Sequence, residues 1–554
     1  MPAFHRHVER LRSVIAAHPV AVVILTGIAW ILPGAIGHDP WKPDEGYTFG
    51  IVYHMLQTGD WVIPTLAGEP FMEKPPLYFL TAALFGKIFA PLLPLHDGAR
   101  LATAAYMGLT LLFVALSGRE LYGPGRGWVA ALMLLSCIGL VAHGHQLLTD
   151  MALLTGFAVS LYGLALASRR PRLGGFWFGT GIGIGFMSKG LLEPGIMGMV
   201  VVAMLAFPHW RTRKFTVTLV IALAAALPWL LVWPTALYWR APDLFYEWFW
   251  IQNWGRFLGL AHLGPEAEPF FYARTLPWFA LPIWPVAVWT LWRTRRDLFS
   301  HTKVLLPLLV FVAIFGVLSI AAERREVYAL PMLLPLSLIA ASGMSTLPLK
   351  AGNGFFATAL LLLAAGATAG WICWTAIQFG VPHWLSNRLD AFQPGYDHRI
   401  HAIAIAIALF YTVAALVLSL SLARSPEKPL IAWVMGLALT WTLAMSLLLA
   451  WLDMGKSYRT TVAGLVAALP PNHRCIYSQS LGEPERALLE YFGNILTERL
   501  EKGNRRTDCD VLIIQDGWDH VHKVGRAWEM IWEGGRPGDS KETLRLYRLA
   551  RSLS

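Results

Sequence analysis

Residues 216–238 read TVTLVIALAAALPWLLVWPTALY, a run without a charged side chain, and they follow the basic segment 211–214. A helix rises about 1.5 Å per residue, so a run of this length matches the roughly 30 Å hydrocarbon core of a bilayer. Similar runs recur along the chain, separated by short segments rich in Arg, Lys, Pro and Gly. The pattern predicts an all-α polytopic membrane protein.

The composition of the chain also indicates a membrane protein. Of its 554 residues, 56% are hydrophobic and 14% are charged, and the mean hydropathy is +0.50. Soluble domains contain about 25% charged residues, and no soluble core could bury this much apolar surface. The formal net charge of +10 comes from basic residues dispersed among short loops, without a continuous basic stripe. We therefore expect membrane lipid around the chain and no nucleic-acid partner.

The apolar runs predict about thirteen spans. The first run, residues 14–36, lacks a small-residue cleavage site and is interpreted as an uncleaved helix. The run at 77–95 is assigned to an interfacial or re-entrant helix, because counting it as a span would place the later basic loops outside. The remaining predicted spans are 101–117, 127–147, 151–168, 174–188, 195–208, 216–238, 275–292, 303–322, 327–346, 355–379, 401–422 and 430–452.

The loop charges predict the topology. Every second loop is short and basic, and such loops face the cytoplasm. We therefore expect a bacterial inner-membrane protein with a cytoplasmic N-terminus and a transmembrane domain over 1–453. Its long periplasmic loops are 37–100 and 239–274, and residues 454–554 form a periplasmic C-terminal domain. The basic loops are Arg119 with Arg126, then 169–172, 211–214 and 293–296.

The C-terminal residues have a different pattern, with frequent and balanced charges. Short strand-like runs occur at 475–478, 511–514 and 544–549, and residues 483–500 are typical of an amphipathic helix. We expect a small α/β domain, with a turn at residues 516–517. Its sequence shows no recognised nucleophile motif or phosphate loop, so its function stays open.

Four cysteines are present, and none has the spacing of a metal site. Cys137 and Cys373 lie within apolar runs and are interpreted as packing residues. Cys475 and Cys509 lie in the C-terminal region, where a periplasmic location would permit a disulfide between them. The sequence by itself leaves that pairing open.

Ionisable residues gather on the predicted outer face. Charges near a bilayer are costly, which makes them functional candidates. Acids beside lysines and arginines suit the transfer of a sugar from a lipid phosphate, because cations stabilise the charge that grows on the leaving phosphate. A carboxylate near the anomeric carbon would orient the acceptor or remove its proton, and an ionised phosphate acceptor would need no base. These residues are Asp44, Glu45, Glu73, Lys74, Asp150, Lys189, Arg324 and Arg325.

Each candidate also has a structural explanation. Asp44 and Glu45 could cap a surface helix over 47–56, Asp150 could cap a span, and lysines near an interface could snorkel to the head groups. His143 and His145 are interpreted as packing residues and not as ligands. All these charged residues are predicted on the outer face of the membrane. This favours a shared site, because independent structural residues should divide between the two faces.

Three motifs in the first outer loop resemble a known family: Pro43-Asp44-Glu45 with Tyr47, then 59–64 (GDWVIP), then 73–78 (EKPPLY). Four further motifs follow in the same order and spacing, at 149–151 (TDM), 188–190 (SKG), 253–258 (NWGRFL) and 325–331 (REVYALP). The chain resembles the ArnT-like and protein-O-mannosyltransferase-like group of GT-C glycosyltransferases over residues 38–335.

The resemblance implies a GT-C fold of about thirteen helices, with juxtamembrane helices in the first outer loop and a cavity that faces the periplasm. It implies that Asp44 is the catalytic aspartate and that Lys74, Lys189 and Tyr328 surround the donor phosphate. Glu73 and His262 match a divalent-metal position (Zn, Mg or Mn) of part of the family, in which a metal requirement is not general. The predicted catalytic residues are Asp44, Glu45, Lys74 and Asp150, and the predicted substrate-binding residues are Tyr47, Tyr78, Lys189, Asn253, Arg256, Arg325 and Tyr328.

One departure from the family bears on the substrates. Aminoarabinose transferases usually have Thr-Arg after the Asp-Glu pair, whereas this chain has Gly46-Tyr47. The general chemistry is kept, but the identity of the sugar and of the acceptor is left open.

The sequence therefore predicts an inverting glycosyltransferase that uses a polyprenyl-phosphate-linked donor. The sugar, with 4-amino-4-deoxy-L-arabinose as one candidate, would pass from undecaprenyl phosphate to lipid A or another envelope glycan at the periplasmic face. A protein O-glycosyltransferase is the nearest alternative. A secondary transporter or lipid flippase is less favoured, because its charges should lie near the bilayer midplane and its helices should show internal repeats.

Overall fold

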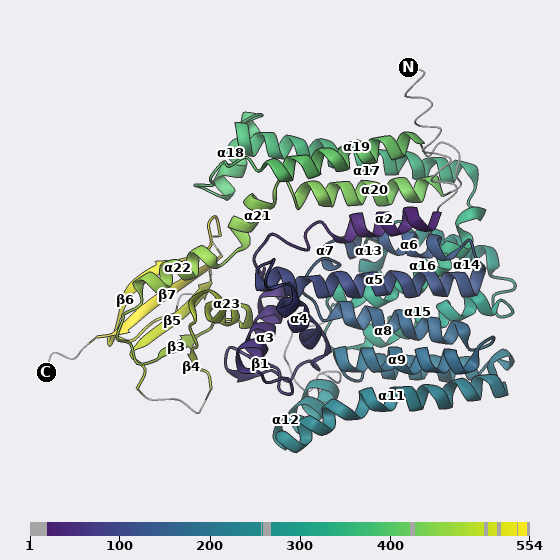
Figure 1. The fold of residues 1–554 in the computed structure, drawn as a ribbon, viewed down its shortest axis with the longest axis horizontal. Helices are drawn as coiled ribbons and strands as arrows, with labels where there is room; N and C mark the ends of the chain where they lie inside the picture. The colour runs from purple at the N-terminus through teal and green to yellow at the C-terminus, as the bar shows by residue number, and fades with distance from the viewer. Residues whose placement is uncertain are drawn as a thin grey trace.

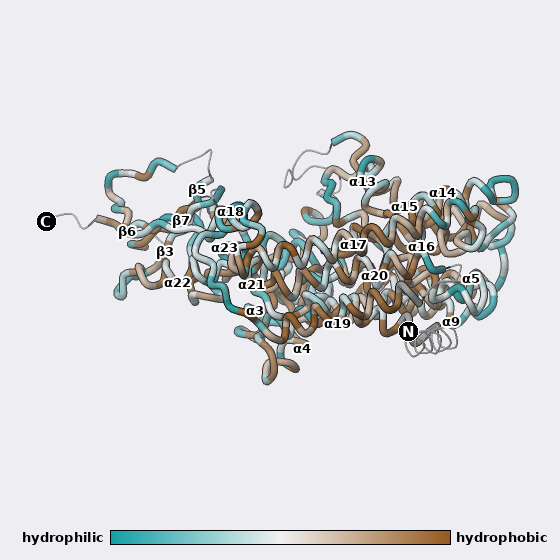
Figure 2. Tube along the Cα trace, turned by 90° about the horizontal axis from the view of Figure 1, so that it is seen from above, coloured by the Kyte–Doolittle hydropathy of each residue, from teal (hydrophilic) through white to brown (hydrophobic). Residues whose placement is uncertain are grey.

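The computed structural model describes residues 19–255, 258, 268–421, 427–502, 508–517, 522–539 and 541–550. Figure 1 shows long helices lying side by side in a bundle, with a smaller α/β domain at one end, next to α3 and α4. In Figure 2 the apolar residues follow the bundle helices, whereas the loops and much of the smaller domain are more polar. This distribution agrees with the predicted membrane part and C-terminal domain.

Helices occupy every predicted span within the described residues. The first half of the bundle contains α2 (Pro19–Ile31), α5 (Leu95–Tyr122), α6 (Gly127–Leu135), α7 (Ile138–His143), α8 (Asp150–Leu166), α9 (Pro171–Lys189), α10 (Leu192–Leu205), η1 (Pro208–Trp210) and α11 (Arg213–Arg240). The second half contains α12 (Pro242–Tyr246), η2 (Glu247–Gly255), α13 (Phe271–Phe279), α14 (Ile283–Thr294), α15 (Thr302–Ile320), η3 (Glu326–Ala329), α16 (Leu330–Gly343), η4 (Met344–Thr346), α17 (Leu349–Phe379), α18 (His383–Phe392), α19 (Ala402–Ser421), α20 (Lys428–Ala444) and α21 (Leu449–Lys456).

The number of spans stays a prediction. Among the described residues, five helices are long and apolar enough to cross a bilayer, or six if α20 and α21, bent by 64°, count as one span. Other predicted spans are shorter or broken, as where α6 gives way to α7 and α13 to α14. Large apolar side chains such as Leu223 and Val232 point outward from α11, 63% and 70% exposed, as expected of a lipid-facing helix.

The basic loops and the first outer loop lie at opposite ends of the bundle. Helices α5 and α11 each have 28 residues and are therefore about 42 Å long. Helix α5 packs against α4 of the first outer loop and carries Arg119 in its last turn. Helix α11 begins after Arg211 and ends at Arg240, which pairs with Asp60 of the first outer loop at 2.8 Å. The separation agrees with the predicted alternation of loops.

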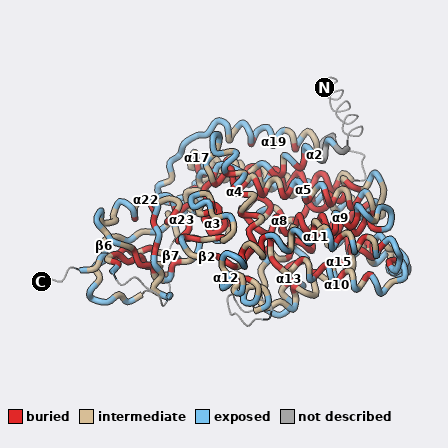
Figure 3. Tube along the Cα trace, turned by 60° about the horizontal axis from the view of Figure 1, so that its bottom comes forward, coloured by how far each residue is buried: buried red, intermediate tan, exposed pale blue. Residues whose placement is uncertain are grey.

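The first outer loop contains α3 (Asp44–Thr58), the hairpin β1 (Thr65–Leu66) and β2 (Glu69–Pro70), and α4 (Leu77–Phe89). Helix α4 has 13 residues, about 20 Å, which is too short to span a bilayer. The interpretation of α3 as a surface helix over 47–56 is wrong. Helix α3 starts at Asp44, most of its residues are buried (Figure 3), and no side chain caps its N-terminus.

A buried ion pair holds the start of α3. Glu45 and Arg100 are 1% and 0% exposed, and the Arg100 Nε lies 2.9 Å from the Glu45 Oε1. The same Glu45 oxygen accepts the Leu147 backbone N–H at 3.1 Å, and its other oxygen accepts the Trp41 N–H at 3.1 Å. Arg100 also donates to the Asp97 carboxylate at 2.7 Å. These contacts join α3 to α5, to the loop before α3 and to the segment before α8.

The C-terminal domain is a five-stranded mixed sheet with the order β4-β3-β5-β7-β6. Strand β3 is parallel to β4 and β5, and β7 is antiparallel to β5 and β6. The elements are α22 (Arg459–Ala468), β3 (Ile476–Gln479), α23 (Glu483–Gly493), β4 (Glu498–Arg499), β5 (Val511–Gly517), β6 (Trp528–Gly534) and β7 (Glu542–Leu549).

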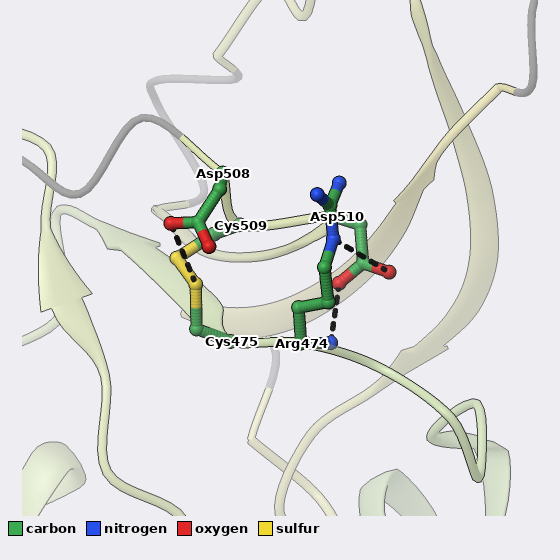
Figure 4. Close-up of a disulfide and its surroundings, with 5 residues drawn as sticks. All are labelled: Arg474, Cys475, Asp508, Cys509 and Asp510. Atoms are coloured by element: carbon green, nitrogen blue, oxygen red, sulfur yellow. Dashed lines mark hydrogen bonds and ion pairs between the residues drawn. A yellow bond between two sulfur atoms is a disulfide. The ribbon is translucent and has the colours of Figure 1, made fainter.

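The predicted α/β class of this domain is confirmed, but several details differ. The helix predicted over 483–500 ends at Gly493, because Asn494 takes a left-handed conformation with φ 51°. The turn predicted at 516–517 lies inside β5, and β6 was not predicted. Cys475 and Cys509 form a disulfide, which joins the segments before β3 and β5 (Figure 4). Beside it, the Arg474 backbone N–H donates to Asp510 at 2.8 Å.

Helix α23 packs directly on α3 through two glycines. A Cβ atom at Gly50 would lie 2.4 Å from the Ala487 Cβ, and one at Gly46 would lie 3.0 Å from the Pro484 Cβ. Ion pairs surround this contact, including Lys42 with Glu485 at 3.1 Å. Gly46 is the first of the two residues, Gly46-Tyr47, at which the sequence departs from the aminoarabinose transferases. The close approach of α23 gives this departure a steric explanation.

Replacing Arg100 with Met should lower the stability of the folded protein by about 3–5 kcal/mol, because Glu45 and Asp97 would keep buried charges without a cation. Thermal unfolding of the purified protein in detergent measures the loss. The control is Arg169→Met, which removes an ion pair whose arginine is 72% exposed and should change stability by less than about 1 kcal/mol. Equal melting temperatures for the two variants would contradict the assignment.

Replacing Gly50 with Ala should separate α23 from α3 and cost about 1–3 kcal/mol of stability. The variant should melt earlier and release the C-terminal domain faster under limited proteolysis. Adding Ala487→Gly to the same chain should restore part of both properties, because it removes the nearest atom that the new Cβ meets, while Leu66 Cδ1 at 3.0 Å and the Ala487 Cα at 3.3 Å remain. Gly108→Ala, at a position with nothing within 4 Å of the added Cβ, is the matched control.

Candidate active site

Asp44, the first residue of α3, faces the end of the bundle beside η3. Both carboxylate oxygens of Asp44 accept from Arg325 Nη2, at 3.0 and 2.9 Å, although 281 residues separate the two in the sequence. The Asp44 and Arg325 side chains are 16% and 40% exposed, so the pair is accessible. One turn later, the Tyr47 hydroxyl approaches Asp44 Oδ1 at 3.4 Å. The start of α3 therefore presents a carboxylate that is already held by a cation.

Lys74 is connected to the Asp44–Arg325 pair through Tyr47. Its Nζ donates to the Tyr47 hydroxyl at 2.6 Å and lies 3.5 Å from Glu73 Oε1. Burial opposes the charged form of Lys74, but the neighbouring Tyr47, Glu73 and Asp150 hold its pKa well above its usual range. Burial raises the pKa of Tyr47 to about 12, which keeps its hydroxyl protonated. Lys74 is therefore a buried ammonium group that the loop after β2 carries into the site.

Lys189 and Asp150 meet at the ends of two neighbouring helices. Asp150 is the first residue of α8 and Lys189 the last of α9, and their side chains are 2.6 Å apart. The Lys189 Nζ lies 4.0 Å from the centre of the Tyr328 ring, a cation–π contact. Tyr328 lies on η3, three residues after Arg325. The helix ends thus add a second acid–cation pair beside the first.

Together these side chains form what we call the charged cluster. Three carboxylates, three cations and two tyrosines come from α3, the loop after β2, α8, α9 and the segment that includes η3. The cluster lies at the end of the bundle next to the C-terminal domain, away from the basic loops. Its members are Asp44, Tyr47, Glu73, Lys74, Asp150, Lys189, Arg325 and Tyr328.

Comparison with known proteins agrees with this arrangement. Residues 73–233 match the family model of dolichyl-phosphate-mannose-protein mannosyltransferases. The structure of ArnT from Cupriavidus metallidurans bound to undecaprenyl phosphate superposes with a TM-score of 0.68 at 18% sequence identity, covering 95% of this chain and 97% of that one. The chain therefore has the fold of ArnT.

The curated relatives are named as arabinosyl transferases. The chain is 29% identical over 404 residues to undecaprenyl phosphate-alpha-4-amino-4-deoxy-L-arabinose arabinosyl transferase 2 of Pseudomonas fluorescens, which covers 70% of this chain and 68% of the relative. It is 30% identical over 373 residues to the corresponding transferase of Pseudomonas aeruginosa, covering 63% and 64%. The resemblance inferred from the sequence motifs is confirmed.

Three of the predicted site residues within the described ranges lie outside the charged cluster. Glu45 is held by Arg100, as described above. The Tyr78 hydroxyl faces α5 and lies 2.6 Å from the Thr103 hydroxyl. Asn253 accepts the Leu191 N–H at 3.1 Å and donates to a backbone carbonyl at 2.8 Å, which holds the turn after α9. The structure therefore gives these three side chains positioning contacts.

The predicted metal site is only partly described. Glu73 belongs to the charged cluster, whereas His262 and the predicted substrate-binding residue Arg256 lie outside the described residues. Within the ranges that the structure describes, no group of three or more His, Cys, Asp or Glu side chains is placed to hold a metal ion. The Glu73 carboxylate lies 3.5 Å from the Lys74 ammonium, which disfavours a second cation there.

Two residues near the charged cluster were missed from the sequence. His143, interpreted as a packing residue, lies close enough to Asp44 and Asp150 for their charges to act on it. Glu483, the first residue of α23, is likewise within reach of Glu73 and Lys74. The position of His143 at the outer end of a predicted span was a usable signal. Nothing in the sequence connects Glu483, some 400 residues away, with the first outer loop.

Proposed function

We propose that the chain transfers a sugar from undecaprenyl phosphate to an acceptor at the membrane face that carries the charged cluster. One observation carries the proposal: the Asp44 carboxylate and the cations of Lys74, Lys189 and Arg325 lie in one cluster at an end of an ArnT-like bundle. The Asp44–Arg325 pair is its accessible part. The relatives named above are arabinosyl transferases that act with undecaprenyl phosphate. The charged cluster and the names of the relatives together indicate the reaction class.

In the proposed reaction the cations receive the leaving phosphate. Transfer of a sugar from a lipid phosphate builds positive charge on the anomeric carbon and negative charge on the phosphate. Lys74 and Lys189, each within 2.6 Å of an oxygen partner, are fixed before the donor arrives. Such preorganised charges need no rearrangement in the transition state. The lipid tail stays in the bilayer while its head group reaches the cluster.

Asp44 acts on the other side of the anomeric carbon in this proposal. Arg325 holds the carboxylate in place and directs it into the cluster. With a hydroxyl acceptor, Asp44 removes its proton, and with an ionised phosphate acceptor it only positions the group. Attack opposite the leaving phosphate inverts the anomeric configuration. Asp150 is proposed to orient Lys189, and Arg256 to contact the substrate.

The finer assignments are part of the proposal. The sugar is 4-amino-4-deoxy-L-arabinose or a related sugar, and the acceptor is lipid A or another envelope glycan. We place the protein in the bacterial inner membrane, with the N-terminus cytoplasmic and with the charged cluster and the C-terminal domain periplasmic. This orientation is supported by the basic loops at the other end of the bundle. Glu45, Tyr78 and Asn253 are proposed to position the elements that carry the cluster.

Asp44→Asn should reduce sugar transfer by about 100-fold or more, because it removes the ionised carboxylate while keeping the side-chain shape. The measurement is mass spectrometry of lipid A and envelope glycans from cells that carry the wild-type gene, the variant or no gene. Asp397→Asn, at a carboxylate that is 66% exposed, is the control and should keep full activity. Unchanged glycans in the deletion strain, together with altered uptake of a solute, would contradict the proposal and favour a transporter.

Removal of divalent metal should leave the transfer rate within about twofold, because the ammonium and guanidinium groups of the cluster already supply the cations for the phosphate. The assay is transfer by the purified enzyme before and after dialysis against EDTA. Two results together would instead establish the metal site predicted at Glu73 and His262. EDTA would remove the activity and Mn²⁺, Mg²⁺ or Zn²⁺ would restore it, and the Glu73→Gln variant would be inactive even with added metal.

A further inference from the structure

The C-terminal domain holds a second group of reactive side chains, apart from the charged cluster. The Ser480 Oγ lies 3.0 Å from the His522 Nε2, and the His522 Nδ1 lies 2.7 Å from the Asp516 Oδ1. These are the atoms and distances of a serine–histidine–aspartate triad, in which the imidazole takes the serine proton and the carboxylate orients the imidazole. The three residues are 36 and 6 positions apart in the chain.

Ser480 lies where a nucleophile should lie. It is exposed, and it occupies the tight turn between the end of β3 and the start of α23. Its φ is 59°, a left-handed conformation that is uncommon for a residue with a side chain. A serine on a strained strand-to-helix turn is the nucleophile elbow of α/β-hydrolases, and their chain order of Ser, Asp and His is also the order found here. Gly482 follows two residues later, as in that motif, whereas Ser478 stands where the motif has its first glycine.

Asp516 is fixed as the orienting acid. It lies on β5, is 2% exposed, and accepts both the backbone N–H of His522 at 2.8 Å and the imidazole at 2.7 Å through one oxygen. Its other oxygen accepts from Arg545 at 2.5 Å. A carboxylate held in this way selects the imidazole tautomer that has its proton on Nδ1. The unprotonated Nε2 then faces the serine hydroxyl.

We propose that Ser480, His522 and Asp516 form a second active site, which cleaves carboxylic esters independently of sugar transfer. The Ser480 oxygen attacks the ester carbonyl carbon while His522 Nε2 takes the hydroxyl proton. The alcohol leaves with that proton, and an acyl-serine remains. Water, deprotonated by the same imidazole, then releases the carboxylic acid and restores the serine.

The backbone limits where the oxyanion binds in this step. The N–H of Ser480 itself donates to Glu501 at 2.6 Å, so it is already used. The N–H of Leu481, the residue after the nucleophile, occupies the position that supplies an oxyanion-hole donor in hydrolases with this turn. The substrate class is an ester with an accessible carbonyl, because Ser480 lies at the surface and not in a deep pocket.

A fluorophosphonate probe tests the proposal, since it reacts covalently with a serine only when a base activates the hydroxyl. The full-length protein in detergent should be labelled on Ser480, as located by peptide mass spectrometry, and should hydrolyse p-nitrophenyl acetate. Ser480→Ala should abolish both reactions, and His522→Gln should slow both by about 100-fold or more. Ser480→Ala should melt at the wild-type temperature, since Ser480 is exposed. His522 is only 18% exposed, so the melting temperature of His522→Gln is measured as well, and its labelling is compared under conditions in which it is folded.

Two controls separate the outcomes. Ser300→Ala, at an exposed serine in the loop between α14 and α15, should leave labelling unchanged. Asp44→Asn should also leave labelling unchanged while it abolishes sugar transfer, which distinguishes the two sites. Labelling of the wild-type protein no faster than that of Ser480→Ala would overturn the proposal and reduce the three residues to a structural hydrogen-bond network.

Discussion

The buried Glu45–Arg100 pair is the interaction on which the site depends. Taking two charges out of water is expensive, and this pair is kept because every remaining hydrogen-bonding group has a partner nearby. It fixes the first turn of α3 against α5. Successive residues of a helix point about 100° apart, so holding Glu45 inward toward Arg100 turns Asp44 outward toward Arg325. The adjacent acids thus have different surroundings and different roles.

The charged cluster is a set of acid–cation pairs. Asp44 is paired with Arg325, Asp150 with Lys189, and Glu73 with Lys74. Three cations near a membrane surface would repel each other if the carboxylates did not lie between them. A phosphate that enters the cluster has to displace carboxylate oxygens from these cations. The pairing therefore stabilises the cluster, and in the proposed reaction it would leave the carboxylates available to act on the sugar.

The C-terminal domain packs against the bundle at the helix that carries Asp44. Helix α23 approaches α3 so closely that Gly46 and Gly50 are needed at the contact, and the pair Lys42–Glu485 ties the residues just before Asp44 to the domain. The domain therefore supports the start of α3 from one side while Arg100 holds it from the other. Its strand-to-helix turn, β3 to α23, presents Ser480 at one end and Glu483, near the cluster, at the other.

The sequence by itself determined the membrane character, the family resemblance and most of the cluster, because long apolar runs and short motifs such as 43–47 and 73–78 are local properties of the chain. It also predicted the strands β3, β5 and β7. Only the tertiary structure decided which ionisable residues meet. Glu45 and Asp44 are neighbours in sequence, yet the helix turns them apart, whereas Arg325 reaches Asp44 across 281 positions. The triad of Ser480, Asp516 and His522 was likewise invisible, because its atoms come together only when β3 pairs with β5. Residue type and periodicity report burial and secondary structure, but distances between side chains depend on how the elements pack.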